Sequence, residues 1–129
     1  MPPARLLLVD DEGALLELLK KYLERLGFEV DACITPQDAL ALFEANPTHY
    51  DLVLTDLTLP DINGEEMLDR MRSRNPDLRA ILASGYPYQP RSEKVDFLQK
   101  PFLPRMLAEA IDKLLKAPFP GARPVSGIT

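Results

Sequence analysis

Four charged side chains and one hydroxyl in this sequence each follow closely after a short apolar run. Each run has the length of a β-strand that is buried on both faces of a parallel sheet. An Asp at the end of a strand is often only a turn residue, so these side chains indicate a functional site only if several strand ends lie at the same edge of the sheet. The side chains are Asp10, Asp11, Asp56, Ser84 and Lys100.

The chemistry open to such a group is metal binding and phosphoryl transfer. Carboxylates that converge raise one another's pKa unless a cation lies among them. Oxygen ligands without His or Cys suit a hard ion, Mg2+ first and Mn2+ or Ca2+ next. Three carboxylates and Lys100 sum to -2, which one divalent ion neutralises. An exposed Asp56 would then accept a phosphoryl group as an acyl phosphate, with the charge divided among the metal, Lys100 and Ser84.

Five segments have the composition of β-strands, and they are the elements that must position these residues. The first and third are apolar runs, and the fourth and fifth are further strand candidates. The second alternates polar and apolar residues and is expected to lie nearer an edge of the sheet. The segments are Arg5–Val9, Phe28–Ala32, Leu52–Asp56, Arg79–Ala83 and Val95–Gln99.

Four further segments carry apolar residues at three- and four-residue spacing, which predicts amphipathic helices. They are Gly13–Leu26, closed by Gly27; the segment capped by Thr35 that stops before Pro47; Glu65–Arg72; and Leu103–Lys116. In the second, the residues expected to face inward are Ala39, Leu40, Leu42 and Phe43, and in the last they are Met106, Leu107, Ile111, Leu114 and Leu115.

Strands and helices alternate along the chain, which predicts an α/β fold: a doubly wound parallel sheet with right-handed crossovers. The carboxyl ends of the strands then share one edge, where ligands bind in open α/β sheets. One connection is unusual. Only ten residues separate Ser84 from Val95, and they include Pro87 and Pro90, so a full helix is not expected there.

The composition is that of one ordinary domain. The 129 residues are 46% hydrophobic and 27% charged, and no apolar run is long enough to cross a bilayer. A net charge of -5 offers no basic patch for nucleic acid or anionic lipid. We therefore expect a cytoplasmic domain over residues 1–117, without membrane insertion or direct nucleic-acid binding, and a Pro/Gly-rich tail or linker over residues 118–129. The lone Cys33 is expected to be a small buried hydrophobe.

Five short motifs, in order along nearly the whole chain from Arg5 to Lys116, resemble the receiver domains of two-component response regulators. Each motif is weak alone, but all five fall at predicted strand ends or turns. They are Leu8-Val9-Asp10-Asp11-Glu12, Leu54-Thr55-Asp56-Leu57-Thr58-Leu59-Pro60, Asn63-Gly64, Ala83-Ser84-Gly85-Tyr86 and Lys100-Pro101-Phe102.

The resemblance implies a flavodoxin-like five-stranded sheet of order 2-1-3-4-5 and a phosphoryl donor that is a phosphohistidine on a histidine kinase or histidine phosphotransfer protein. It also implies a cis peptide bond at Lys100-Pro101. The roles that it implies are Asp56 as phosphoacceptor, Asp11 as direct metal ligand, Asp10 as holder of metal-bound water, Thr58 as a carbonyl ligand, Ser84 and Phe97 as the switch pair, and Lys100 as the phosphoryl-binding lysine.

The segment Tyr86–Lys94 departs from the family pattern. Most receivers have a full fourth helix between the fourth and fifth strands, and here the segment is too short and too rich in proline, so that helix is shortened or absent. The usual dimerisation and output face is therefore in doubt, and a homodimer is neither predicted nor excluded. The altered face, together with Ser84-Gly85-Tyr86, resembles receivers attached to hybrid histidine kinases.

Simpler roles and other functions stay open at this stage. Ser84 is also a typical turn residue and Phe97 a typical core residue. The chain is expected to be no enzyme beyond its own phosphorylation and dephosphorylation. A Mg2+-dependent phosphohydrolase is disfavoured because Thr58 stands where such enzymes place a second Asp. A receiver-like scaffold that binds partners without phosphorylation is the other alternative. The remaining candidates are His49 as a surface or C-cap residue and Glu65 and Glu66 as complements of a helix dipole. For Tyr86 and Tyr88 two roles stay open, facing a partner or covering a core edge where a helix is missing.

Overall fold

The computed structural model describes residues 3–90 and 94–115, in which five strands alternate with four helices. The predicted tail 118–129 lies outside the described residues. The elements in chain order are β1 (Arg5–Val9), α1 (Gly13–Arg25), β2 (Glu29–Cys33), α2 (Pro36–Ala45), β3 (Leu52–Asp56), α3 (Gly64–Arg74), β4 (Arg79–Ser84), β5 (Val95–Gln99) and α4 (Pro104–Leu115).

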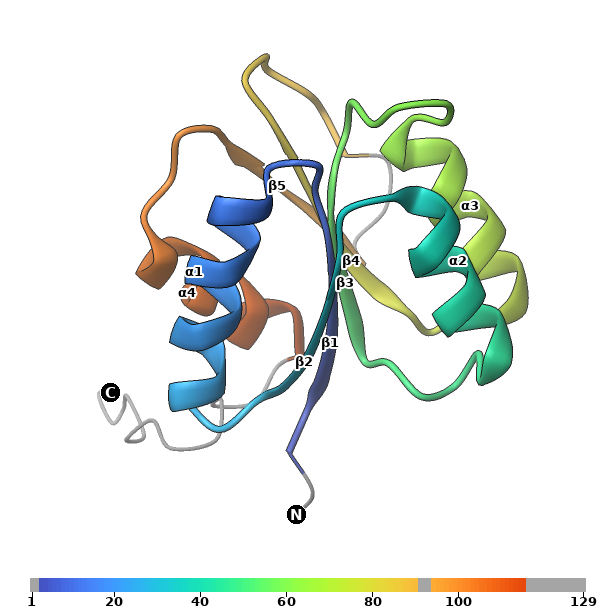
Figure 1. Cartoon of the computed structure of the whole chain (residues 1–129), viewed down its shortest axis with the longest axis horizontal. Coiled ribbons are helices and arrows are strands. Elements are labelled where there is room, and N and C mark those ends of the chain that lie inside the picture. Colours follow the sequence, from blue (N-terminus) through green and yellow to red (C-terminus); the bar gives the residue numbers. More distant parts are fainter. Residues whose placement is uncertain (1–2, 91–93, 116–129) are drawn as a thin grey trace.

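The strands form one parallel sheet of order β2-β1-β3-β4-β5, which confirms the predicted flavodoxin-like topology. The sheet separates two helical layers, with α1 and α4 on one face and α2 and α3 on the other (Figure 1). The predicted alternating strand, β2, lies at one edge, whereas β1 and β3 are central and almost fully buried. Because strands buried on both faces need no polar alternation, apolar runs predicted them correctly.

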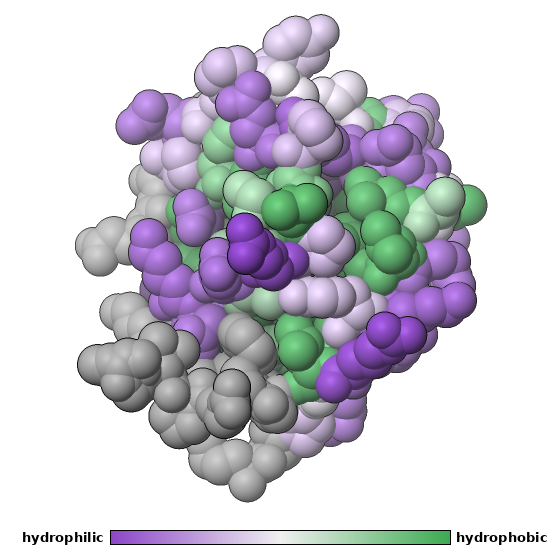
Figure 2. Space-filling model, turned by 90° about the vertical axis from the view of Figure 1, so that its left-hand side faces the viewer, coloured by the Kyte–Doolittle hydropathy of each residue, from purple (hydrophilic) through white to green (hydrophobic). Residues whose placement is uncertain are grey.

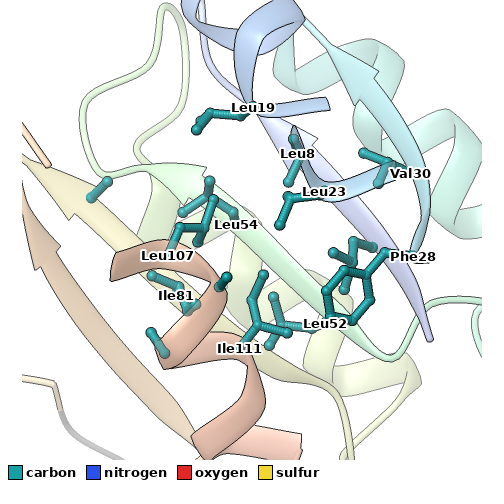
Figure 3. Close-up of a cluster of buried hydrophobic side chains, with 14 of the residues drawn as sticks. Leu8, Leu19, Leu23, Phe28, Val30, Leu52, Leu54, Ile81, Leu107 and Ile111 are labelled. Atoms are coloured by element: carbon teal, nitrogen blue, oxygen red, sulfur yellow. The ribbon is translucent and has the colours of Figure 1, made fainter. Parts of the chain in front are cut away.

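Each face of the sheet has its own apolar core. On the first face, Leu8, Leu54 and Ile81 of the sheet pack with Leu107 and Ile111 of α4 (Figure 3). On the second face, Phe43, Met67 and Met71 of the helices are fully buried against the other side of the same strands. Each such side chain contributes roughly 1.5–3 kcal/mol when removed from water, so the two cores hold the strand ends in place.

Side-chain caps fix where two of the helices begin. The predicted cap Thr35 accepts a hydrogen bond from the amide of Asp38 (3.1 Å) at the start of α2. Asn63 does the same for the amide of Glu66 (2.8 Å) at the start of α3. Each bond satisfies a backbone donor that the first turn of a helix leaves without a partner.

Two residues predicted to face inward are exposed instead. In α2, Ala39 and Phe43 are fully buried, whereas Leu42 is 43% exposed. In α4, Leu107 and Ile111 are fully buried, whereas Met106 is 41% exposed. At about 100° per residue, Leu42 lies about 60° from buried Ala39 and Met106 about 40° from buried Ala110, so both border the buried stripe of their helices. Those two predictions were wrong although both helices were right.

The connection between β4 and β5 contains no helix in its described residues, Gly85–Pro90 and Lys94, as the sequence predicted. The helix called α4 here is the one that follows β5. None of the helices within residues 3–90 and 94–115 has both the length and the apolar content that a membrane span needs.

The sequence predicted simple structural roles for Cys33 and His49. Cys33 is buried at the end of β2, and burial, followed by the charges of Asp38 and Asp31, raises the pKa of its thiol to about 11. It is the small buried hydrophobe that was predicted. His49 is half-buried, with its ring edge-on to Tyr50 (4.9 Å between centroids).

Candidate functional site

The carboxyl ends of β1, β3 and β5 bring the predicted charged residues together. Asp10 and Asp11 follow β1, Asp56 ends β3, and Lys100 follows β5. Carboxylate oxygens of Asp10, Asp11 and Asp56 all lie within 4.8 Å of one another. The prediction that these strand ends meet is therefore confirmed, because the parallel register places them at one edge of the sheet.

Lys100 lies at the centre of this group. Its Nζ atom donates to Asp10 Oδ2 (2.8 Å), Glu12 Oε1 (3.0 Å) and Asp56 Oδ2 (3.1 Å). An ammonium group has three N–H donors, so these three carboxylates account for all of them. The lysine therefore fixes the relative positions of the side chains after β1 and at the end of β3.

The surroundings of Lys100 keep it charged. Burial alone lowers the pKa of this lysine, but the hydrogen bonds to Asp10, Glu12 and Asp56 outweigh burial, and the net shift is upward. The Asp10 side chain is nearly as buried as the core, at 8% exposed, whereas the Glu12 side chain is 62% exposed. The strongest pair of the cluster is thus the one farthest from solvent.

Glu12 is a member of the cluster that sequence reasoning left without a role. Its signal was present, since it continues the acidic run Asp10-Asp11-Glu12 at the end of the first strand. With Glu12, the cluster has four carboxylates, three of which pair with the Lys100 ammonium, and its formal charge is -3 rather than the -2 expected from the sequence. The site therefore attracts cations more strongly than predicted.

Backbone amides hold two of the carboxylates. The amide of Glu12 donates to Asp10 Oδ1 (2.9 Å), and the amide of Thr58 donates to Asp56 Oδ1 (3.2 Å). Each carboxylate accepts from the residue two positions on, which is the turn geometry that a strand-end Asp favours. The turn role and the site role thus coexist in the same residues. For Thr58, the contact seen is through its amide, and the predicted carbonyl ligand remains a prediction.

Gly64 lets the first turn of α3 approach the backbone of Asp56. The Gly64 amide donates to the Leu57 carbonyl (2.8 Å). A Cβ atom built on Gly64 would lie 2.3 Å from the carbonyl oxygen of Asp56, closer than any side chain permits. The sequence indicated a turn and a family motif at Asn63-Gly64, and the structure shows in addition that the glycine is needed for the close approach of two backbones.

Ser84 closes the same edge from β4. Its carbonyl accepts from the amide of Lys100 (2.8 Å), and its Oγ atom accepts from the amide of Tyr86 (3.0 Å). The second bond is the turn role that the sequence left open for Ser84. The peptide bond Lys100-Pro101 is cis, as the resemblance implied.

Phe97 and Tyr88 lie together behind this edge. Their ring centroids are 6.0 Å apart, with the planes inclined by 50°, and both rings pack partly buried against the second core. The Tyr88 hydroxyl donates to the carboxylate of Glu65 in the first turn of α3. Tyr88 therefore covers a core edge, as one of the open alternatives held, while Glu65 has a partner beyond the helix dipole.

An open hollow of about 370 Å³ lies beside Lys100. It is lined by Glu12, Leu15, Lys100, Pro101 and Phe102. Figure 2 shows apolar patches among the charged side chains on the face that carries α1 and α4. Leu18 of α1 and Met106 of α4 are exposed large apolar side chains. A partner that reaches the charged edge from this side meets both apolar and charged groups.

The donor set fits a hard divalent cation. Asp10, Asp11 and Asp56 offer only oxygen atoms, and their burial falls from Asp10, which is buried, through Asp56 to Asp11, which is exposed. Such a set suits Mg2+ better than a soft metal, and the negative charge left over by Lys100 is available to a cation.

Known proteins resemble the chain over most of its length. A family model described as the response regulator receiver domain matches residues 6–112. The regulatory protein VanRB of Enterococcus faecalis is 34% identical over 117 residues, which cover 87% of this chain and 52% of VanRB. The sensor kinase CckA of Brucella abortus is 30% identical over 119 residues, which cover 88% of this chain and 13% of CckA.

The fold is similar to a solved receiver structure. The crystal structure of the receiver domain from hybrid histidine kinase CckA superposes with a TM-score of 0.78 and 30% identity. The match covers 87% of this chain and 99% of that one. The chain thus corresponds to one domain of these relatives, since it spans about half the length of VanRB and 13% of CckA.

Proposed function

The chain belongs to the response regulator receiver domain family of two-component signalling, and from this premise we propose that Asp56 accepts a phosphoryl group from a phosphohistidine. The single observation that supports this role is the arrangement of Asp56 with Asp10, Asp11 and Lys100. The carboxylate of Asp56 lies within hydrogen-bond distance of an ammonium group and beside two further carboxylates. Receiver domains act with histidine kinases or phosphotransfer proteins, and the donor proposed here is of that kind.

In the proposed reaction, a carboxylate oxygen of Asp56 attacks the phosphorus of the donor. The P–N bond breaks, its electron pair stays on the imidazole, which takes up a proton from water and leaves neutral, and the chain is left with an acyl phosphate on Asp56. Lys100 faces the oxygens that gain charge during this transfer. Its raised pKa keeps the ammonium charged at neutral pH, so it stabilises that charge without a proton transfer.

Lys100 has to exchange a partner in order to reach a phosphoryl oxygen, because three carboxylates already occupy its donors. Glu12 is the most exposed of the three and is re-solvated at the least cost when it is released. Asp10 is the most buried and retains the lysine. We therefore expect the contact with Glu12 to be lost first.

A divalent ion completes the proposed site. When bound, Mg2+ supplies the positive charge that neutralises the phosphoryl oxygens. The residues that would hold it are Asp11 and Asp56 directly, Asp10 through water, and the carbonyl of Thr58. Mn2+ is the expected substitute because it accepts the same oxygen ligands.

We propose that the chain turns over no other substrate and catalyses at most its own phosphorylation and dephosphorylation at Asp56. Its output is then association with a partner in the cytoplasm. VanRB and CckA match at similar identity, so attachment to a hybrid histidine kinase remains a prediction.

The test is phosphorylation by a small acyl phosphate in the presence of Mg2+, followed by the mass of the intact protein. One phosphoryl group is expected on the wild type and none on Asp56→Asn. Asp38→Asn, outside the cluster, is the matched control and should be labelled like the wild type. Labelling that persists in Asp56→Asn contradicts the assignment. Steady hydrolysis of a phosphomonoester favours a phosphohydrolase, and Mg2+ binding without labelling or conformational change favours a scaffold.

A further inference from the structure

The shortened connection between β4 and β5 carries two tyrosines in different environments. Tyr86 is 78% exposed, whereas Tyr88, two residues later, is partly buried. The described part of the connection, Gly85–Pro90 and Lys94, has no helical hydrogen bonds to hold it. Side-chain contacts hold Gly85–Pro90, whereas the carbonyl of Lys94 also accepts a hydrogen bond from the backbone amide of Ala80 (2.9 Å).

Tyr88 makes contacts on two neighbouring elements. Its ring lies against Phe97 of β5, and its hydroxyl donates to Glu65 in the first turn of α3. Val95 and Phe97 of β5 pack beside Tyr88 against the second core. Tyr88 thus covers apolar residues of β5 on the face that a helix between β4 and β5 would cover.

Both ends of this arrangement reach the proposed phosphorylation site. The first turn of α3 lies directly against the backbone of Asp56, because Gly64 has no side chain that would keep the two backbones apart. The connection itself starts at Ser84, whose Oγ atom accepts from the amide of Tyr86. Asp56 pairs with Ala83 in the sheet, so the Ser84 side chain comes from the next residue of the neighbouring strand.

We propose that Tyr88 is a tether that holds the β4–β5 connection over Val95 and Phe97 while Asp56 is unphosphorylated, and that phosphorylation releases it. This inference rests on the proposed function of Asp56. The Ser84 hydroxyl that bonds to a phosphoryl oxygen turns away from the Tyr86 amide, and the start of the connection moves. A movement that takes the Tyr88 hydroxyl beyond hydrogen-bond distance of the Glu65 carboxylate breaks the bond between them. The apolar residues of β5 then become exposed.

The state of the tether can be followed by fluorine NMR of protein labelled with 3-fluorotyrosine. The chain has four tyrosines, and the resonance that is lost in Tyr88→Phe belongs to Tyr88. Glu65→Gln weakens the bond and should move this resonance. Glu66→Gln, in the same helical turn, is the matched control and should leave it in place. The Tyr22 and Tyr50 resonances serve as internal references.

Phosphorylation is imitated with beryllium fluoride and Mg2+, whose binding gives its own fluorine signal. In the wild type, the Tyr88 resonance is expected to move in the direction that Glu65→Gln moves it. Hydrogen exchange at the Tyr88 and Gln89 amides should accelerate about fivefold, the factor for one ordinary hydrogen bond. In Tyr88→Phe, exchange should already be fast and beryllium fluoride should add little.

The outcomes separate the tether from the proposed function. If beryllium fluoride binds and Asp56 is labelled by an acyl phosphate, but the Tyr88 resonance and the exchange rates stay unchanged, the tether is wrong and the function stands. If neither binding nor labelling occurs, the proposed function fails and the tether fails with it. If Tyr88→Phe does not fold, Glu65→Gln alone tests the tether, because the contact between the Tyr88 and Phe97 rings is intact in that variant.

Discussion

The charged edge of the sheet and the β4–β5 connection lie side by side but are held in different ways. At the charged edge, Lys100 alone bonds to three carboxylates from two elements, and backbone amides fix two of those carboxylates again. Contacts spread along the sequence hold the described part of the connection: Tyr86 with Ser84, Tyr88 with Glu65 and Phe97, Gly85 with Gln99, and Lys94 with Asp77 and the Ala80 amide. The difference indicates that the backbone of the first region stays in place during the chemistry, although Lys100 exchanges one carboxylate partner, and that the second region responds to the chemistry.

Replacement of Lys100 by Met is expected to have the largest effect on stability. It leaves buried Asp10 without its cation, and removal of one partner from a buried pair costs about 3 kcal/mol. Partial exposure of Lys100 makes that value an upper estimate. Because the cluster then has four uncompensated carboxylates, Mg2+ should stabilise Lys100→Met more than the wild type. Urea unfolding with and without Mg2+ measures both effects.

Lys20 provides the matched control for this prediction. It forms a surface pair with Glu24 four residues on (2.8 Å), and such pairs contribute about 0.3–0.5 kcal/mol. Lys20→Met should therefore change the free energy of unfolding little, with or without Mg2+. Equal losses in the two variants would show that the charged edge is no more tightly held than the surface.

Gly64→Ala is expected to cost somewhat less, about 2 kcal/mol, as for other insertions into a packed region. The new Cβ atom meets the Asp56 carbonyl at 2.3 Å, so α3 or the end of β3 has to move. Phosphorylation at Asp56 should slow at the same time. Gly13→Ala is the control, because nothing lies within 4 Å of its Cβ position at the start of α1. A Gly64→Ala protein with wild-type stability would contradict the close contact.

The same comparison explains how far the sequence predicted the molecule. The central strands β1 and β3 and their shared edge were predicted because strands buried on both faces are apolar runs, and these two end at residues of the site, whereas β2 was predicted from its alternation. The contact of Glu12 with Lys100 and that of Glu65 with Tyr88 were not, since they join residues 88 and 23 positions apart. No periodicity in a single sequence encodes such pairs.

Burial of individual helix residues was predicted less well than the helices themselves. The spacing of leucines and methionines identified α2 and α4, but Leu42 and Met106 lie beside the apolar stripe and not on it. The width of a stripe depends on how a helix sits against its sheet, which is a property of the packed structure. The role of Gly64 was not predictable for the same reason, because only the packed structure shows that it lies against the backbone of Asp56.

Unfolding at alkaline pH should reveal how well the Cys33 thiol, at the end of β2, is shielded from water. Burial raises the pKa of this thiol from an ordinary value of 9.0 to about 11. The unfolded chain therefore loses this proton first, and the stability linked to Cys33 is fully present below about pH 9 and is lost as the pH rises to about 11. Cys33→Ala should be less stable at neutral pH yet fall less steeply across that range in urea unfolding. Parallel curves for the two proteins would place the thiol in solvent.

Gly85→Ala is expected to have the smallest effect, and it tests how tightly the β4–β5 connection is packed. Gly85 begins the β4–β5 connection, nothing lies within 4 Å of its Cβ position, and its backbone is not in the left-handed region. An alanine there meets no atom, and it lowers the conformational entropy of the unfolded chain, so stability should stay the same or rise by about 0.4–1 kcal/mol. Thermal unfolding of Gly85→Ala beside Gly64→Ala measures the contrast directly. A loss in Gly85→Ala as large as that in Gly64→Ala would mean that the connection is packed as tightly as the charged edge, and a tether released by phosphorylation would then have no free space in which to move.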